Sequence, residues 1–207
     1  MTAADPATDG ASEHPTAPNA ARFAPLADPE LSARWAKFPN WDRRYFPNVV
    51  GLELEEVRTD YARLRLPYRS ELDQPAGVVH GGALATLIDT CVVPAVGQGY
   101  GIGWAYLTIQ MDVRYLGAVV GEDAIAEGWI EQRGRTLVFC RAEVRVPSGK
   151  LVADGTLTYT IRNKATGETI AVKRASGEAV IQLPRVNGKI ALQSIAIQWS
   201  ESGDLTD

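Results

Sequence analysis

Apolar and polar residues alternate along much of this chain, which is the pattern of half-buried β-strands. The clearest alternation is Tyr61-Ala62-Arg63-Leu64-Arg65-Leu66, and it predicts a strand over residues 60–67 that pairs with a strand over 50–57. Later stretches predict four more strands, at 105–116, 122–132, 136–146 and 151–162. In the first of these we expect a shared apolar face made of Leu107, Ile109, Met111 and Val113.

One stretch breaks the alternation. Residues 77–89 begin as a loop with the pair Gly81-Gly82 and continue into an apolar run. Asp89 is the only charged residue between His80 and Tyr100. The run over 81–98 is rich in Gly, Ala and Thr, and it contains Pro94 as well as the carboxylate, so it predicts a buried helix rather than a membrane span.

These elements predict an α+β fold in which an antiparallel sheet packs on one face of a long helix. The order is two strands, the helix, and then four strands in a meander, with a hairpin at Arg133-Gly134-Arg135. A short helix over 29–38 should precede them, capped by Asp28, and an aromatic-rich connector with Arg43 and Arg44 should follow it.

The chain divides into three parts by composition. Residues 1–27 are rich in Ala, Pro, Thr and Asp, which indicates a disordered tail. Residues 28–163 hold the predicted domain. Residues 164–207 form a C-terminal extension without an assigned function, in which 170–173, 179–183 and 190–199 are either short strands or an arm that packs on a neighbour.

Composition and charge exclude several classes of protein. A length of 207 residues with 45% hydrophobic residues supports a proper core, and a net charge of −4 without a Lys/Arg-rich block argues against a nucleic-acid partner. No secretion signal or membrane span is expected, and the two cysteines, Cys91 and Cys140, suit buried thiols in a cytoplasmic protein. With only His14 and His80 and no CxxC pair, we expect neither a metal site nor a cofactor.

The glycine pair and Asp89 are the residues that suggest chemistry. Backbone N–H groups at a helix start lack partners and lie at the positive end of the helix dipole, so Gly81 and Gly82 can stabilise an oxygen that gains negative charge. Alternatively, the two glycines only permit tight packing. Asp89 can serve as a general base or a nucleophile, or it can simply face solvent.

Helix geometry constrains how these groups act together. Gly81 and Asp89 are eight residues apart, which is about 12 Å along an α-helix, so one carbonyl cannot contact both in a single subunit. Two antiparallel helices in a symmetric dimer would bring Gly81 of one chain beside Asp89 of the other. The functional interpretation of this stretch therefore predicts a homodimer with shared sites.

Two other kinds of chemistry receive weaker support. A nucleophile pair of Cys91 and His80 is conceivable, although 11 residues of helix separate them, and His80 is better interpreted as orienting the loop through its ring N–H. Arg133 and Arg135 flank a glycine at the predicted hairpin, where they either hold a phosphate or are ordinary solvated turn residues.

The segment from Gly77 to Asp89, with its His80-Gly81-Gly82 motif, resembles the signature of the hotdog-fold acyl-CoA thioesterases of the PaaI-like and 4-hydroxybenzoyl-CoA group. Residues 107–116, 121–123 and 133–137 are similar to later strands of that family, so the resemblance covers about 48–163. It implies a sheet wrapped around a central helix, with the active site at the interface of a homodimer or homotetramer.

The resemblance also implies roles for individual residues. The Gly81 N–H polarises the thioester carbonyl, helped by the Gly82 end of the helix, and Asp89 of the other subunit is nucleophile or general base. Gln74 stands where relatives commonly carry Asn and would orient the water or the acyl carbonyl, and Thr108 stands where they often carry Ser and would assist the acid. The nucleotide of coenzyme A would lie near Arg133, Gly134, Arg135 and Thr136.

Three functions from different classes follow. The leading one is hydrolysis of an acyl-CoA thioester, without a preference for chain length or aromaticity that the sequence reveals. The alternatives are a hotdog protein that binds acyl-CoA or a fatty-acyl ligand without turnover, and a scaffolding dimer in which 164–207 supplies a partner surface. A hotdog hydratase fits less well, because those enzymes use a differently placed His with an acid and His80 is the only usable histidine.

Overall fold

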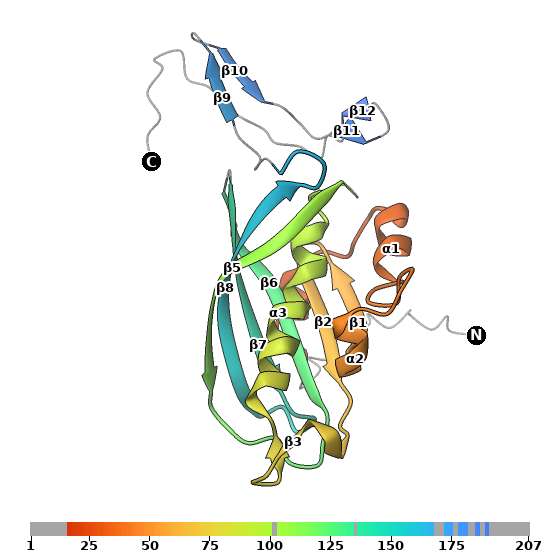
Figure 1. The fold of residues 1–207 in the computed structure, drawn as a ribbon, viewed down its shortest axis with the longest axis vertical. Helices are drawn as coiled ribbons and strands as arrows, with labels where there is room; N and C mark the ends of the chain where they lie inside the picture. Colours follow the sequence, from red (N-terminus) through yellow and green to blue (C-terminus); the bar gives the residue numbers. More distant parts are fainter. Residues whose placement is uncertain are drawn as a thin grey trace, which may run out of the picture.

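Six antiparallel strands form one sheet that curves around a long helix, α3 (Gly81–Gly97), in the computed structural model of the chain (Figure 1). The structure describes residues 16–100, 103–134, 136–167 and four short strands between 172 and 190. In spatial order the sheet strands are β1 (Glu53–Arg58), β2 (Tyr61–Leu66), β6 (Ala124–Arg133), β7 (Leu137–Arg145), β8 (Leu151–Asn163) and β5 (Trp104–Tyr115). The predicted α+β class, with an antiparallel sheet wrapped around a central helix, is confirmed.

The place of β5 corrects the predicted meander. Of the four strands after α3, only β6, β7 and β8 pair in chain order, whereas β5 pairs with β8 at the far edge and β6 pairs with β2. The helix between β2 and β5 carries the chain across the sheet, so β5 lies at the opposite edge and β6 returns to pair with β2. Alternation within a strand does not reveal this, because it reports the faces of a strand and not its neighbours.

A β-bulge also corrects the predicted apolar face of β5. The pairing with β8 shifts between Thr108 and Gln110, which leaves Ile109 as the extra residue. Because a bulge reverses the side on which later residues fall, Leu107 and Met111 lie on opposite faces of the sheet instead of sharing one. Leu107, Ile109 and Met111 are all exposed in the single chain.

Close approach of α3 to the sheet builds the core. Leu84, Leu87, Ile88 and Cys91 of α3 are buried, as the helical spacing predicted. Glycines of the sheet lie beneath them: a Cβ on Gly128 would stand 2.8 Å from Val92, and one on Gly155 would stand 3.0 Å from Ile88. The absent side chains let the helix backbone lie nearer to β6 and β8 than any larger residue would allow.

The segment before α1 packs on the outer face of the sheet, so the expectation of a disordered tail fails for residues 16–27, while residues 1–15 lie outside the described part. Phe23 stacks on Tyr61 at 5.1 Å between ring centroids. Asn19, just before the short helix η1 (Ala20–Arg22), donates from its backbone and side-chain nitrogens to the Glu127 carboxylate, at 3.0 Å each. Burial beneath this segment raises the pKa of Glu127.

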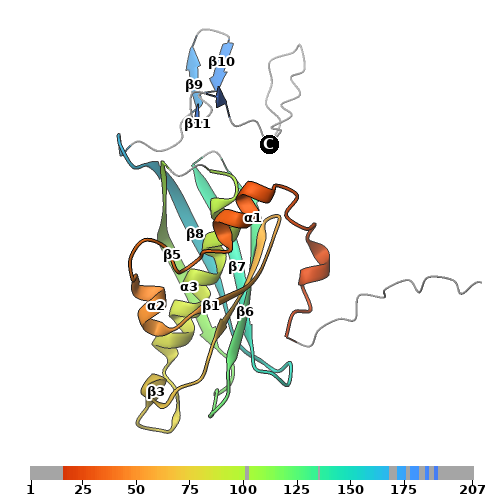
Figure 2. The ribbon, with the colours of Figure 1, turned by 90° about the vertical axis from the view of Figure 1, so that its right-hand side faces the viewer.

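Two short helices precede the sheet (Figure 2). The second packs on α3, and the first contacts the end of α3 through Trp35, whose ring lies against Gly97. The first, α1 (Pro29–Trp35), is capped as predicted, since Asp28 accepts from the Glu30 N–H at 2.8 Å, and it ends three residues earlier than expected. The second, α2 (Phe46–Val50), replaces the end of the predicted connector. Gly51 ends it with φ of +86°, so β1 begins at Glu53 rather than at residue 50.

Smaller elements complete the described chain. The short helix η2 (Ser70–Leu72) and the hairpin of β3 (Asp73–Gln74) and β4 (Val78–Val79) lead into α3. In the C-terminal extension, β9 (Val172–Ala175) pairs with β10 (Glu178–Ile181), and β11 (Arg185–Val186) pairs with β12 (Lys189–Ile190). The predicted strand over 190–199 lies almost wholly outside the described residues. No helix in the described part is long and apolar enough to cross a membrane.

The contact of Gly97 with Trp35 gives a test of the packing. A Cβ on Gly97 would stand 2.4 Å from the fully buried Trp35 ring. Alanine normally favours a helix over glycine by about 1 kcal/mol, yet we expect Gly97→Ala to lower the free energy of unfolding by about 2 kcal/mol because the ring cannot yield. Urea denaturation would measure this.

Gly103→Ala is the matched control, because a Cβ at Gly103 meets nothing within 4 Å. We expect its free energy of unfolding to stay within about 0.5 kcal/mol of wild type. Equal stability of the two variants would contradict the tight contact between α1 and the end of α3.

Candidate active site

The Asp89 carboxylate meets two hydroxyl groups from the sheet. Its Oδ1 atom accepts from Thr108 Oγ1 at 2.7 Å and lies 2.7 Å from the Tyr159 hydroxyl, which is also 2.8 Å from the Asp89 carbonyl oxygen. Thr108 on β5 and Tyr159 on β8 are directly paired across the ladder, so both side chains point to the same side. The predicted association of Thr108 with Asp89 is therefore present.

This arrangement distinguishes the two carboxylate oxygens. Oδ1 is held by both hydroxyls, whereas Oδ2 has no hydrogen-bond donor among the residues that the structure describes. No Lys, Arg or His of that part of the chain lies within 4.0 Å of Asp89 either. A partly buried carboxylate with one fixed and one free oxygen is oriented to use the free one on a substrate or a water.

Tyr159 is the site residue that sequence reasoning missed. Its side chain is 1% exposed, and burial together with the Asp89 charge raises the pKa of the phenol well above its ordinary value. It therefore stays a neutral donor toward the carboxylate. The available signal was the alternation of the last sheet strand, which places Tyr159 on the same buried face as Leu157 and Ile161, where a phenol needs a polar partner.

His80 caps the start of α3 and is exposed. Its Nδ1 accepts from the Gly82 N–H at 2.8 Å, which corrects the expected role of a ring N–H donor and occupies the Gly82 amide. The Gly81 N–H has no acceptor among the described residues, and this leaves it available to a ligand. Tyr115 donates to the Gly81 carbonyl oxygen at 3.0 Å and so ties the end of β5 to the helix start.

Gln74 belongs to the same end of the helix. It lies exposed on β3, where its carbonyl oxygen accepts from Gly77 at 2.9 Å in the turn before β4 and α3. The adjoining Leu72 carbonyl oxygen accepts from the His80 N–H at 2.7 Å. Gln74 thus lies in the segment that leads into Gly81 at the start of α3. Thr108 and Tyr159 lie beside Asp89, about two helical turns further along α3. A single chain presents two separate groups of residues.

The hairpin between β6 and β7, where the family resemblance would place the nucleotide, holds Arg133 through bonds within the chain. Arg133 forms an ion pair with Asp60 at 2.6 Å and donates to the Ala95 and Val96 carbonyl oxygens, at 2.8 and 3.2 Å. A cation at the C-terminal end of a helix is stabilised by the unpaired carbonyl groups and the dipole. The guanidinium is therefore already engaged.

Gly134 and Thr136 of that hairpin form no hydrogen bond with Asp89. Gly134 donates to the Leu137 carbonyl oxygen at 2.8 Å, Thr136 is exposed, and Arg135 lies outside the described residues. The structure thus separates this hairpin, at the C-terminal end of α3, from the Gly81 end.

Cys91 does not form a nucleophile pair with His80. Its Sγ atom lies 3.3 Å from the carbonyl oxygens of Ala62 and Ala126, on the sheet side of α3. Burial raises the pKa of the thiol, which disfavours the reactive thiolate. Among the described residues no group of three or more His, Cys, Asp or Glu side chains could hold a metal ion.

A curved antiparallel sheet around one long helix is the arrangement of the hotdog fold, the fold of the thioesterase superfamily. Comparison with known proteins agrees. The family model of the thioesterase superfamily matches residues 76–153. A candidate esterase of Halobacterium salinarum is 32% identical over 114 residues, which cover 53% of this chain and 75% of that protein.

Two further proteins are similar. Human acyl-coenzyme A thioesterase 13 is 27% identical over 123 residues, 58% of this chain and 87% of that one. A solved structure of a thioesterase-superfamily protein is 30% identical with a TM-score of 0.55, and the match covers 64% of this chain and 97% of that chain. The chain belongs to the thioesterase superfamily.

The contact of Tyr159 with Asp89 can be tested without a substrate. In a double-mutant cycle of Tyr159→Phe and Asp89→Ala, we expect the free energies of unfolding to show a coupling of about 1–2 kcal/mol. Either single substitution already removes the hydrogen bond between the two side chains, so the second substitution costs less in the double variant. Chemical denaturation of the four proteins measures it.

Tyr61→Phe provides the control, since its hydroxyl donates to Glu127 on the other face of the sheet, at 2.9 Å. A cycle of Tyr61→Phe with Asp89→Ala should show no coupling beyond about 0.3 kcal/mol. Absence of coupling in the Tyr159 cycle would remove Tyr159 from the site.

Proposed function

We propose that this protein hydrolyses acyl-CoA thioesters, with Asp89 as the reacting carboxylate and the Gly81 N–H as the oxyanion donor. The observation that carries the proposal is the Asp89 carboxylate, fixed through Oδ1 by Thr108 and Tyr159 and free at Oδ2. Membership of the thioesterase superfamily supports thioester hydrolysis. The name of the human relative supports coenzyme A as the carrier of the acyl group.

The chemistry follows from these two groups. As general base, Oδ2 takes a proton from water while the water oxygen adds to the thioester carbonyl. The carbonyl oxygen becomes negative and accepts from the Gly81 N–H. The C–S bond then breaks, Asp89 passes its proton to the departing thiolate, and the products are a carboxylic acid and the coenzyme A thiol. As nucleophile, Oδ2 would instead add to the carbonyl and expel the thiolate, which takes a proton from water, and a second water would then cleave the acyl anhydride to the carboxylic acid and the Asp89 carboxylate.

The two groups must come from different subunits. Gly81 and Asp89 lie about 12 Å apart on α3, which is too far for one carbonyl to reach both. Gln74 stands with Gly81, where its amide would orient the acyl carbonyl or the water. A complete site therefore combines Gln74 and Gly81 of one chain with Asp89, Thr108 and Tyr159 of another.

Strand β5 offers the surface for this pairing. It is the edge of the six-stranded sheet, and it runs along α3 from the contact of Tyr106 with Gly97 to that of Tyr115 with Gly81. A long apolar edge strand favours pairing with another strand. The exposed apolar side chains along this edge are Leu107, Ile109, Met111 and Tyr115. Antiparallel pairing of two β5 strands would set Gly81 of each chain toward Asp89 of the other.

The Gly81 amide can be removed with little change in shape. Gly81 is the first residue of α3, a position that accepts proline, and His80 has φ of −61° and ψ of 133°, which suit the residue before proline. We expect Gly81→Pro to lower kcat for an acyl-CoA by about 10²- to 10³-fold, because the oxyanion donor is lost. Thiol release from a panel of acyl-CoAs measures this.

Gly81→Ala is the matched control, since it keeps the N–H and adds a Cβ at 3.2 Å from the exposed Tyr115 ring. It should retain most of the activity, while Asp89→Asn should lose it with the fold intact. An equal loss of activity in Gly81→Ala and Gly81→Pro would show that the added side-chain volume, and not the missing N–H, causes the loss. Full activity of Asp89→Asn would rule out the mechanism. Failure of the wild type to hydrolyse any thioester would rule out the function.

Shared sites predict complementation between inactive variants. When Gly81→Pro and Asp89→Asn chains are co-expressed, half of randomly assorted dimers are mixed, and each mixed dimer has one intact site. We therefore expect about a quarter of the wild-type activity. Activity no higher than that of the separate variants, in a preparation shown to contain mixed dimers by two affinity tags, would place both groups in one subunit.

A further inference from the structure

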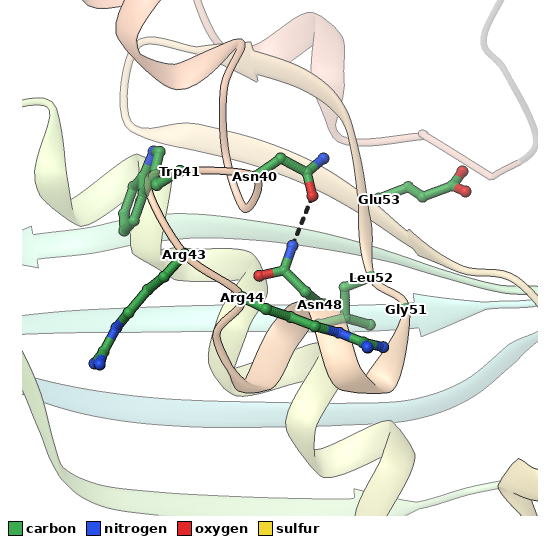
Figure 3. Close-up of a pocket in the computed structure, with 8 residues that line it drawn as sticks. All are labelled: Asn40, Trp41, Arg43, Arg44, Asn48, Gly51, Leu52 and Glu53. Atoms are coloured by element: carbon green, nitrogen blue, oxygen red, sulfur yellow. Dashed lines mark hydrogen bonds between the residues drawn. The ribbon is translucent and has the colours of Figure 1, made fainter.

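A pocket of about 470 Å³ lies outside the segment that matches the thioesterase family, between the end of α1 and the start of β1 (Figure 3). The connector of α1 and α2 supplies Trp41, Arg43 and Arg44, and Asn40 and Asn48 lie hydrogen-bonded between them. The catalytic proposal uses none of these residues. Their chemistry indicates a ligand that is both aromatic and anionic.

Trp41 forms a fixed aromatic surface at one side of the pocket. Its ring centroid lies 5.4 Å from that of Phe38, 6.2 Å from that of Tyr45 and 6.4 Å from that of the buried Trp35. Although three rings hold it, Trp41 remains 46% exposed. An indole that is held in place and yet open to solvent suits stacking with a flat heterocycle such as a purine.

Arg43 and Arg44 supply positive charge that the protein does not neutralise. Neither guanidinium has a carboxylate within 4.0 Å in the described part of the chain. The pocket's own acid, Glu53, is paired with Arg65. Figure 3 shows the two arginines extending to opposite sides of the Asn40–Asn48 pair, which suits a ligand with two separated anionic groups.

Hydrogen bonds hold this part of the chain in shape. Asn48 accepts from the Tyr45 N–H at 2.9 Å and donates to Asn40 at 2.6 Å, which fixes the loop that carries both arginines. At the other end of α2, Arg69 donates to the Val49 and Val50 carbonyl oxygens, each at 2.7 Å. A pocket whose frame is already ordered loses little freedom when it binds a ligand.

We propose that this Trp41–Arg44 pocket binds the nucleotide end of the acyl-CoA substrate. The purine stacks on Trp41, and Arg43 and Arg44 bind the ribose phosphate and the diphosphate, which stand on different sides of the ribose. This inference rests on the proposed function. It places nucleotide recognition in the connector between α1 and α2, and not at the β6–β7 hairpin, where Arg133 already binds the helix end.

Binding of adenosine 3′,5′-bisphosphate to the Asp89→Asn protein tests the pocket without turnover. By titration calorimetry we expect the double variant Arg43→Gln/Arg44→Gln to bind at least tenfold more weakly. The variant Arg162→Gln/Lys164→Gln removes the same charge from the end of β8 and should bind as the parent does. Equal weakening in both double variants, or no binding to the parent, would overturn the proposal.

Ligand fragments separate the two halves of the pocket. Trp41→Leu should weaken the bisphosphate at least fivefold and leave the affinity for inorganic pyrophosphate within twofold. Unfolding curves confirm that the variant is folded, and if it is not, Trp41→Phe takes its place. A loss that is equal for both ligands would show that Trp41 does not contact the base.

Kinetics then link the pocket to the substrate. Arg43→Gln/Arg44→Gln should lower kcat/KM for an acyl-CoA about tenfold relative to kcat/KM for the same acyl group on N-acetylcysteamine, which has no nucleotide. An equal loss on both thioesters would overturn the assignment. If the wild type cleaves neither thioester, the proposed function fails, while the calorimetric result still decides whether the pocket binds a nucleotide.

Discussion

The close seating of α3 in the curved sheet is the constraint on which the site depends. Gly128 and Gly155 lack the side chains that would hold Val92 and Ile88 away, so the helix lies low against β6 and β8. At that depth the Asp89 carboxylate reaches Tyr159 and Thr108, which are paired on neighbouring strands. A side chain at either glycine would move the helix away from the sheet and lengthen the 2.7 Å hydrogen bonds from Thr108 and Tyr159 to Asp89 Oδ1. The contact that packs the helix therefore also positions the carboxylate.

Under the proposed mechanism, the same seating would leave each chain with only part of a site. A straight helix separates its first amide from a side chain two turns later by about 12 Å, and no side-chain rotation shortens that distance. Asp89 and its hydroxyl partners border the unpaired edge strand β5, as does Tyr115 beside Gly81. The unpaired backbone of β5 and its exposed apolar side chains therefore lie along the same border of the molecule as Gly81 and Asp89. The proposed dimer would form along this border.

The arginines of this fold differ in whether carbonyl or carboxylate groups of the chain already hold them. Arg133 is held by Asp60 and by the carbonyl groups at the end of α3. Arg69 likewise closes α2. Arg43 and Arg44 have no carboxylate partner in the described part of the chain, although Arg43 lies over the Tyr45 ring, 4.6 Å from its centroid. A cation already bound to helix carbonyls would have to give up those bonds to accept a phosphate, whereas these two would give up water and, at Arg43, a contact with one ring face.

The sequence by itself determined the helix, the approximate positions of the six strands and the isolated carboxylate eight residues after a glycine, because these depend on local periodicity and spacing. It predicted Thr108 near Asp89 only through resemblance to a family. The tertiary structure alone decided that β5 lies beside β8, that a bulge divides its apolar face, that Tyr159 reaches Asp89 and that Arg133 caps a helix. Each of these depends on contacts between residues far apart in the chain, and alternation within a strand carries no information about which strand lies next to it.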